Sequence, residues 1–152
     1  MTSWAMYERV LLALTIWREA RGESREAKIA VGCSVRNRVQ NPKWWGNDYI
    51  SCLTKKWQYS SMTDPKDRQL TTWPAASDHV FEECLEIAEG VIAGQLISPV
   101  TPGADSYYDV SIPPPKWATE DKKVGTIGRL VFYNLDQDYE AVKKFLAVNL
   151  FP

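Results

Sequence analysis

The sequence predicts a mainly α fold of the α+β kind, with long aromatic-rich loops and a small β element. Three observations predict it. Apolar residues recur at helical spacing in several stretches, one segment is rich in Trp, Tyr and Pro without any periodicity, and a short apolar run near the end has strand character. With 152 residues, 45% of them hydrophobic, we expect a single domain over residues 1–152.

Two helices open the chain. Dense apolar residues predict the first over 4–20, and Gly22 provides a stop just after it. Ser24 is a suitable N-cap for the second helix, which Asn41-Pro42 ends. The two helices therefore meet at a tight corner.

The rest of the chain mixes loops with shorter elements. Residues 42–76 are expected to be irregular, apart from a helical piece near 49–53. A third long helix follows Ser77 or Asp78 as its cap and runs to Ile92. Beyond it we expect, in order, a loop over 99–115, a short strand within 125–133 and a final amphipathic helix over 138–148.

Charge and residue counts exclude several classes of function. Eighteen Lys and Arg against nineteen Asp and Glu give a net charge of -1, which argues against a nucleic-acid partner. The single histidine, His79, leaves no imidazole set for a catalytic triad or a His-rich zinc site, so neither a metal nor another cofactor is expected. The apolar stretch 10–17 is short for a membrane span, so no membrane insertion is expected.

Three cysteines, Cys33, Cys52 and Cys84, lie at wide spacings without a C-x-x-C pair. This pattern favours reduced and partly buried thiols, and leaves a disulfide open as the alternative.

Glu19 is the candidate with the clearest chemistry. It lies in the last turn of an apolar helix, where the helix dipole and burial beside Trp17 both disfavour the ionised carboxylate and raise its pKa. Such a glutamate is a general acid that protonates a glycosidic oxygen, although a glutamate at a helix end is also often structural. Glu23, four residues later, pairs with Arg21 or Arg25 as readily as it contacts a substrate.

Several sequence motifs resemble those of one known protein family. The run L-A-L-T-I-W-R-E-A-R-G-E, followed by A-K-I-A-V-G-C-S-V-R-N-R-V, resembles the SleB/CwlJ cell-wall hydrolase family. Residues 56–60 look like that family's Q-F-S motif, and residues 104–108 with 112–117 look like its Y-Y segment followed by P-x-W. Residues 125–133 are similar to its closing G-x-I-G-x-H-x-F-Y block. One position departs, since Leu130 stands where the family commonly has His.

The resemblance implies a lysozyme-like fold that acts on the glycan strands of peptidoglycan. It implies that Glu19 is the catalytic acid, that Glu23 belongs to the site, and that Gln58 and Ser60 line the sugar cleft. Independently, Gln58 and Ser60 alternate around Tyr59, so an extended loop would direct both into one cleft.

Aromatic residues later in the chain are candidate sugar contacts. Tyr107, Tyr108 and Trp117 offer flat faces for pyranose rings, with packing of a long loop on the core as the alternative. Trp44 and Trp45, between Pro42 and Gly46, are more typical of loop anchoring.

Two reaction outcomes remain open. A lytic transglycosylase uses one glutamate and forms a 1,6-anhydro product, as the resemblance favours, whereas a hydrolytic muramidase needs a second carboxylate. Glu23 and Asp64 are the candidates for it. A different class, a non-catalytic glycan-binding or virion structural protein, is consistent with the Leu130 departure. A metal-dependent amidase lacks its ligand set.

The chain also carries expectations about its setting. It shows no signal peptide and no added wall-binding domain, as in a phage endolysin, so we expect a monomer that stays cytoplasmic until a holin-type opening releases it to the wall. A virion-associated lysin and a host enzyme are the alternatives.

Overall fold

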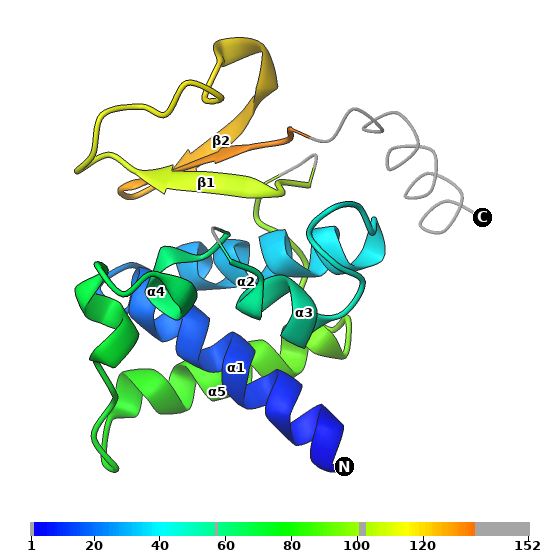
Figure 1. Ribbon diagram of the computed structural model, residues 1–152, viewed down its shortest axis with the longest axis vertical. Coiled ribbons are helices and arrows are strands. Elements are labelled where there is room, and N and C mark those ends of the chain that lie inside the picture. Colours follow the sequence, from blue (N-terminus) through cyan, green and yellow to red (C-terminus); the bar gives the residue numbers. More distant parts are fainter. Residues whose placement is uncertain (1, 57, 101–102, 136–152) are drawn as a thin grey trace.

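The computed structural model describes residues 2–56, 58–100 and 103–135. Helices form one layer, and a three-stranded sheet lies over one side of it (Figure 1). The helices are α1 (Ser3–Ala20), α2 (Arg25–Gln40), α3 (Tyr49–Thr54), α4 (Ser60–Thr63) and α5 (His79–Ile92), with 3-10 turns η1 (Arg68–Thr71) and η2 (Glu120–Lys122). The strands are β1 (Ser106–Asp109), β2 (Lys123–Ile127) and β3 (Leu130–Tyr133). The mainly α, α+β fold class predicted above is confirmed.

Local capping explains where the helices begin. The Ser24 side chain accepts a hydrogen bond from the amide of Ala27, as predicted, and Asp78 rather than Ser77 caps α5 through the amide of Phe81. Asp48 and Ser51 form a reciprocal capping box at α3. The helices expected over 4–20, 49–53 and up to Ile92 therefore lie where their patterns place them, whereas the one expected over 138–148 lies outside the described residues.

The core lies where α1, α2 and α5 pack together. Gly32 of α2 lies at their meeting point, because a Cβ there would be 3.2 Å from both Ile16 of α1 and Val91 of α5. Leu12, Ile16, Val31 and Val91 are fully buried around this point. A small residue on α2 thus lets the three helices approach closely.

The sheet corrects two expectations. Its order is β1-β3-β2, with both pairings antiparallel. Residues 125–133 form a β-hairpin rather than one strand, because Gly128, with a φ of 56°, turns the chain back between β2 and β3. β1 lies within the stretch 99–115 that was expected to be loop. Its pairing partner β3 is more than twenty residues away, so no local sequence pattern predicts β1.

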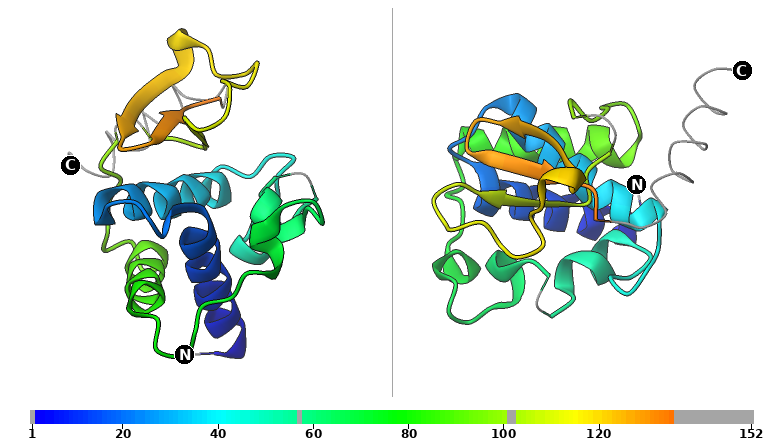
Figure 2. Two further views of the ribbon diagram at one scale, coloured as in Figure 1. Left: turned by 90° about the vertical axis from the view of Figure 1, so that its left-hand side faces the viewer. Right: turned by 90° about the horizontal axis from the view of Figure 1, so that it is seen from above.

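The segment 42–76 is also more ordered than expected, since it contains α4 and η1 in addition to α3. Both extra elements are a single turn long, too short for helical periodicity to reveal. The left view of Figure 2 shows the strands above the helices, and the right view looks down onto the sheet with the helices behind it.

The end of α2 joins the sheet to the helical layer. The Arg38 Nε donates to the Asp105 carbonyl at 2.6 Å, and its Nη2 contacts the Ser106 hydroxyl at 3.4 Å. Asn37 donates to the Ala104 carbonyl at 2.9 Å. Two neighbouring side chains of α2 therefore position the start of β1.

Glu23, in the turn between α1 and α2, makes a second connection. Its Oε1 accepts a hydrogen bond from the backbone amide of Arg129 at 3.3 Å. A Cβ on Gly128 would lie 2.6 Å from its Oε2. The β2–β3 turn therefore rests directly on the α1–α2 corner.

Three further findings concern the described residues alone. Cys33, Cys52 and Cys84 are buried free thiols. None of the helices there is long and apolar enough to cross a bilayer. Within the same residues, no group of three His, Cys, Asp or Glu side chains is arranged to hold a metal ion.

Replacing Gly128 with alanine tests the contact at the β2–β3 turn. We expect a loss of about 1–2 kcal/mol in unfolding free energy, because the new Cβ meets the Glu23 carboxylate and the positive φ is strained for alanine. Urea denaturation measures it. Gly94→Ala, with φ 75° and open space, isolates the backbone strain, and Gly22→Ala, with open space and no positive φ, controls for both. Equal stability of Gly128→Ala and Gly22→Ala would contradict the assignment.

Replacing Arg38 with alanine tests the connection between the layers. We expect a loss of about 2–4 kcal/mol, because buried acceptors on the sheet and on Gln58 lose their donor together. The same denaturation measurement applies, with Lys66→Ala as control because Lys66 is exposed. A loss of less than about 0.5 kcal/mol, typical of a surface change, would disprove the connection.

Candidate active site

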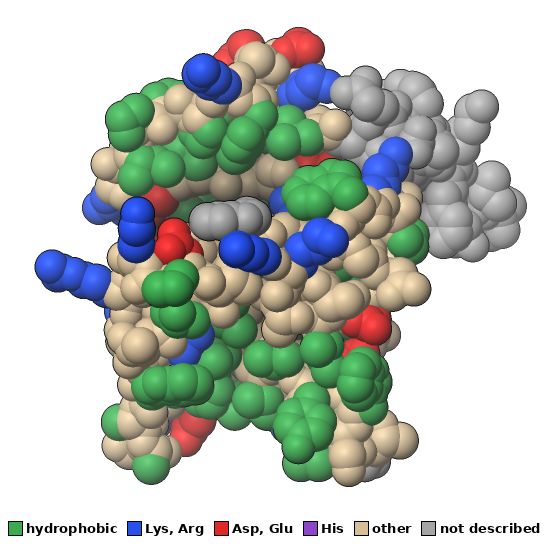
Figure 3. Space-filling model, in the orientation of Figure 1, with side chains coloured by type: hydrophobic (Ala, Val, Ile, Leu, Met, Phe, Trp, Pro, Cys, Tyr) green, Lys and Arg blue, Asp and Glu red, His purple; other side chains and the backbone are tan. Residues whose placement is uncertain are grey.

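A cleft of about 580 Å³ lies between the two layers. One wall comes from the helical layer, with Glu19 of α1, Arg38 of α2 and the segment 58–64. The other comes from β1, the loop after it and β3. In the space-filling view, hydrophobic side chains gather over the sheet, and Lys and Arg side chains surround the boundary between sheet and helices (Figure 3). This volume is in the range of small-molecule and cofactor sites.

Glu19 is half-buried in this cleft. Its Oε1 accepts a hydrogen bond from the Ser61 hydroxyl at 3.1 Å. The Tyr107 hydroxyl reaches toward the same carboxyl from β1, without a hydrogen bond of normal length to any described residue. The carboxyl thus meets hydroxyl groups from both walls.

The Glu19 pKa is raised to about 7. Burial is the largest cause, and the negative charges of Asp67 and Asp109 add to it, while Ser61 and Tyr107 partly oppose it by stabilising the carboxylate. The raised pKa predicted from sequence is confirmed. A group of this pKa gives and takes protons near neutral pH.

The surroundings that bury Glu19 differ from those expected. Trp17 packs edge-on against Phe81 of α5, with ring centroids 6.5 Å apart, and the Arg21 guanidinium lies 4.4 Å from the Trp17 ring. The rings that share the cleft with Glu19 are Tyr59 and Tyr107. Successive positions on a helix point in different directions, so Trp17 faces the core while Glu19 faces the cleft.

The structure brings Gln58 and Ser60 to the cleft as well. Both polar groups are engaged with protein partners. The Gln58 oxygen accepts from the Arg38 guanidinium and its nitrogen donates to the Trp45 carbonyl at 3.1 Å, while the Ser60 hydroxyl donates to Asp67 at 2.6 Å. Gln58 therefore also helps to build the wall it lines.

Aromatic residues form much of the sheet-side wall. Tyr108 and Trp117 line the cleft. Their ring centroids lie 6.3 Å apart, and those of Tyr108 and Trp117 lie 6.0 and 5.5 Å from that of Tyr133. Trp117 is 38% exposed, so part of its ring faces solvent. The cluster gives the open side of the cleft a flat apolar surface.

Glu23 is the one predicted site residue that does not line the cleft. Its carboxylate lies against the Gly128–Arg129 turn instead. This favours the alternative of a structural pairing, with a backbone amide as the partner rather than Arg21 or Arg25.

Several cleft residues had no assignment from the sequence. Arg38 was noticed only as part of N-R-V, and Asp109 only as a neighbour of motif residues. Ser61, which does not line the cleft but donates to Glu19, also had no assignment. Trp44 was expected to anchor a loop, but Trp45 does so by donating to the Arg38 carbonyl at 2.8 Å, while Trp44 lines the cleft and is 65% exposed. No local signal separates the two tryptophans.

Leu130 also lines the cleft, at the strand position paired with Asp109. Its side chain is 1% exposed, so this part of the wall is apolar.

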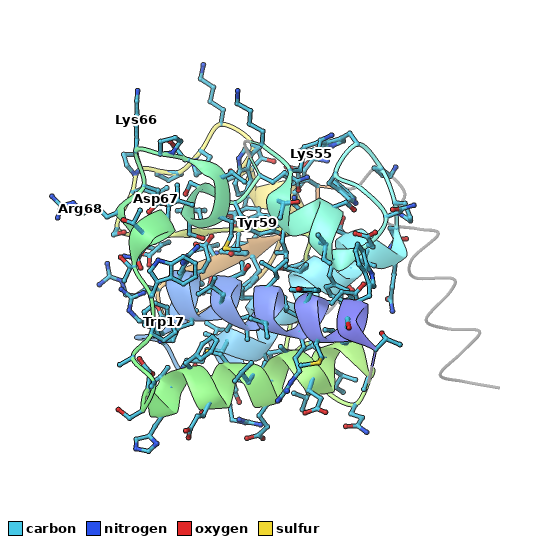
Figure 4. The ribbon with its side chains drawn as sticks, turned by 60° about the horizontal axis from the view of Figure 1, so that its bottom comes forward. Trp17, Lys55, Tyr59, Lys66, Asp67 and Arg68 are labelled. Carbon is cyan, nitrogen blue, oxygen red and sulfur yellow. The ribbon has the colours of Figure 1, made fainter. Side chains whose placement is uncertain are left out.

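Arg18 explains why Ser61 lies beside Glu19. Its Nη1 donates to the Ser61 carbonyl at 3.0 Å and its Nε to the Thr72 carbonyl at 3.2 Å, which holds α4 and the end of η1 against α1. Figure 4 shows Tyr59 and Asp67 in this segment above α1, whereas Lys66 points away from the molecule. Arg18 therefore positions the segment, and its neighbour Glu19 accepts a hydrogen bond from the Ser61 hydroxyl of that segment.

The family described as Cell Wall Hydrolase has a sequence profile that matches residues 22–133. The match includes Arg38, Gln58 and the sheet, and begins just after Glu19. Comparison with curated proteins finds no significant match.

Two solved structures share the fold. One is the catalytic domain of the germination-specific lytic transglycosylase SleB from Bacillus anthracis, with a TM-score of 0.67 and 19% identity over 88% of this chain and 99% of that one. The other is the catalytic domain of the Bacillus cereus SleB protein, with a TM-score of 0.66 and 21% identity over 85% and 91%. At these identities the likeness establishes the fold.

Removing the Ser61 hydroxyl tests its effect on Glu19. In Ser61→Ala we expect the Glu19 pKa to rise by about half a unit to one unit, because the carboxylate loses a hydrogen bond that favours its ionised form. A ¹³C NMR titration of the Glu19 carboxyl measures it. The adjacent Ser60→Ala, whose hydroxyl bonds Asp67, should leave this pKa in place. A fall, or equal shifts in both variants, would contradict the assignment.

Proposed function

The chain belongs to the cell wall hydrolase family, and we propose that it cleaves peptidoglycan glycan strands between N-acetylmuramic acid and N-acetylglucosamine, with Glu19 as general acid. The observation that carries this proposal is Glu19 itself. It combines a pKa of about 7 with a place in an aromatic-lined cleft, so a substantial part of the enzyme holds a protonated carboxyl near neutral pH.

The aromatic wall supports a sugar polymer as the ligand. Tyr108 and Trp117 offer flat apolar surface to pyranose rings, and the exposed Trp44 offers the same from the helical side. We assign glycan contacts to these three residues, and to Tyr107, Gln58 and Ser60 deeper in the cleft. Glu23 is left out of this set because it lies against the β2–β3 turn.

We propose the lytic transglycosylase route. Glu19 donates its proton to the glycosidic oxygen as the bond from the muramic acid C1 breaks, and the electron pair of that bond stays on the oxygen. The resulting Glu19 carboxylate takes the proton of the sugar's own 6-hydroxyl, whose oxygen closes the 1,6-anhydro ring on C1. The name of the Bacillus anthracis relative favours this outcome.

Hydrolysis by water is the second candidate, because further carboxylates line the cleft. Asp64, expected from sequence, and Asp109 both do so. A muramidase would use such a group to activate water and would leave a reducing end. The products therefore separate the two routes.

Exchange of Glu19 for Gln tests the proposal. The substitution keeps the side-chain shape and removes the acid, so we expect product release from purified peptidoglycan to fall about 10³-fold. Mass spectrometry of the soluble products measures it. Anhydro-muropeptides from the unmodified protein support the transglycosylase route, and reducing-end products the hydrolase.

Glu26→Gln is the matched control, since Glu26 is exposed in the first turn of α2. Undiminished activity in Glu19→Gln would refute the assignment of Glu19. Binding of peptidoglycan without any soluble product from the unmodified protein would support the glycan-binding alternative instead.

A further inference from the structure

We propose that Asp109 is a catalytic residue, an ionised carboxylate that faces the reacting sugar from the sheet wall while Glu19 acts from the helical wall. The inference rests on the proposed function, and it gives that site a second acidic group of distinct role. Sequence reasoning did not assign Asp109, and named Glu23 and Asp64 as the candidates.

Asp109 lies on the sheet wall of the cleft. It is the last residue of β1 and lines the same cleft as Glu19. Side chains two residues apart on a strand share a face, so Asp109 lies on the face of Tyr107, whose hydroxyl reaches toward the Glu19 carboxyl. Asp109 therefore approaches the site of bond cleavage from the wall opposite Glu19.

Hydrogen bonds hold the Asp109 carboxylate in place. Its Oδ1 accepts a hydrogen bond from the amide of Ser111 at 2.8 Å and from the Arg129 Nε at 3.4 Å. Arg129 comes from the β2–β3 turn, which itself rests on Glu23. The carboxylate is thus positioned by the sheet and, through that turn, by the α1–α2 corner.

The surroundings of Glu19 and Asp109 shift the pKa values of the two carboxyls in opposite directions. Burial raises the Glu19 pKa, and Asp67 and Asp109 raise it further, against hydroxyl contacts from Ser61 and Tyr107. Burial also raises the Asp109 pKa, but the hydrogen bonds from Ser111 and the charge of Arg129 outweigh it and leave the pKa below its usual value. Arg38, Tyr59, Asp64 and Tyr108 are the other ionisable side chains that line the cleft.

Opposed pKa values give the two groups different roles at one pH. Between the two values, Glu19 holds a proton while Asp109 is ionised, so one carboxyl can donate a proton while the other supplies negative charge. The transition state carries positive charge at the anomeric carbon. As Glu19 protonates the leaving oxygen, the Asp109 charge stabilises that centre, and no bond to Asp109 forms.

Asp64 is the competing carboxylate, and the observations disfavour it. It follows α4 on the helical wall, the same wall as Glu19, so it does not face Glu19 from the sheet as Asp109 does. Besides burial, the charges of Asp67 and Asp109 are among the main causes of the raised Glu19 pKa. Asp67 is occupied by hydrogen bonds from Ser60 and the Gln69 amide.

The test compares Asp109→Asn with Arg129→Gln on purified peptidoglycan, with kcat, KM and pH profile measured for each. We expect Asp109→Asn to lower kcat about 100-fold with little change in KM, because the lost charge acts only in the transition state. We expect Arg129→Gln to stay within about tenfold and to move the acidic limb of the profile to higher pH, because Asp109 then binds a proton more readily.

Asp121→Asn, an exposed change on η2, controls for loss of one negative charge. Asp109→Asn with near-normal kcat, while Glu19→Gln is inactive, would overturn this inference and leave the proposed function standing. Equal losses in Asp109→Asn and Arg129→Gln would assign Asp109 to a structural ion pair and overturn it too. An unmoved acidic limb in Arg129→Gln overturns it even if Asp109→Asn does not fold. Full activity of Glu19→Gln would overturn both proposals.

Discussion

The whole cleft depends on the buried guanidinium of Arg38. Its planar group has five donors in a fixed arrangement, so one side chain serves three acceptors from two distant parts of the chain. These acceptors are the Asp105 carbonyl and Ser106 hydroxyl at the start of β1, and the Gln58 amide oxygen before α4. The aromatic rings of Trp45 and Tyr59 lie over its faces at 5.2 and 5.3 Å. Both walls of the cleft are therefore attached to the end of α2. This attachment fixes the distance between the sheet and the helical layer.

Arg18 and Glu19 are neighbours on α1 with different roles at the site. Arg18 turns toward the α4–η1 segment and holds it by backbone carbonyls, and this brings the Ser61 hydroxyl onto the Glu19 carboxyl. Burial alone would favour a neutral Glu19 so strongly that it would be a weak acid, and the hydroxyl contacts offset part of that effect. The resulting pKa of about 7 suits a group that must first donate and then accept a proton. On the facing wall, the pKa of Asp109 is lowered, and Arg129 contributes to this shift.

The helices were predictable because their causes are local. Capping by Ser24 and Asp78 and the apolar spacing of α1, α2 and α5 act within a few residues, and all of them are visible in the sequence. The sheet was predictable only in part. The apolar run of β3 predicts a strand. In contrast, β1 is four residues long and is defined by its pairing with β3, which the local sequence does not reveal. The turns α4 and η1 are likewise held by Arg18 from a distant helix rather than by their own periodicity.

The sequence by itself determined the mainly α fold class, the family resemblance and the position of Glu19 in the last turn of an apolar helix, because helix formation and motif spacing are both written in consecutive residues. Only the tertiary structure decided the rest of the site. It placed Glu23 against a turn instead of in the cleft, separated the cleft-lining Trp44 from the anchoring Trp45, and brought Ser61 and Asp109 toward Glu19. These outcomes depend on distances between segments far apart in the chain, which are set by the packing of α1 against α4 and by the hydrogen bonds of α2 to β1, and no run of consecutive residues encodes such distances.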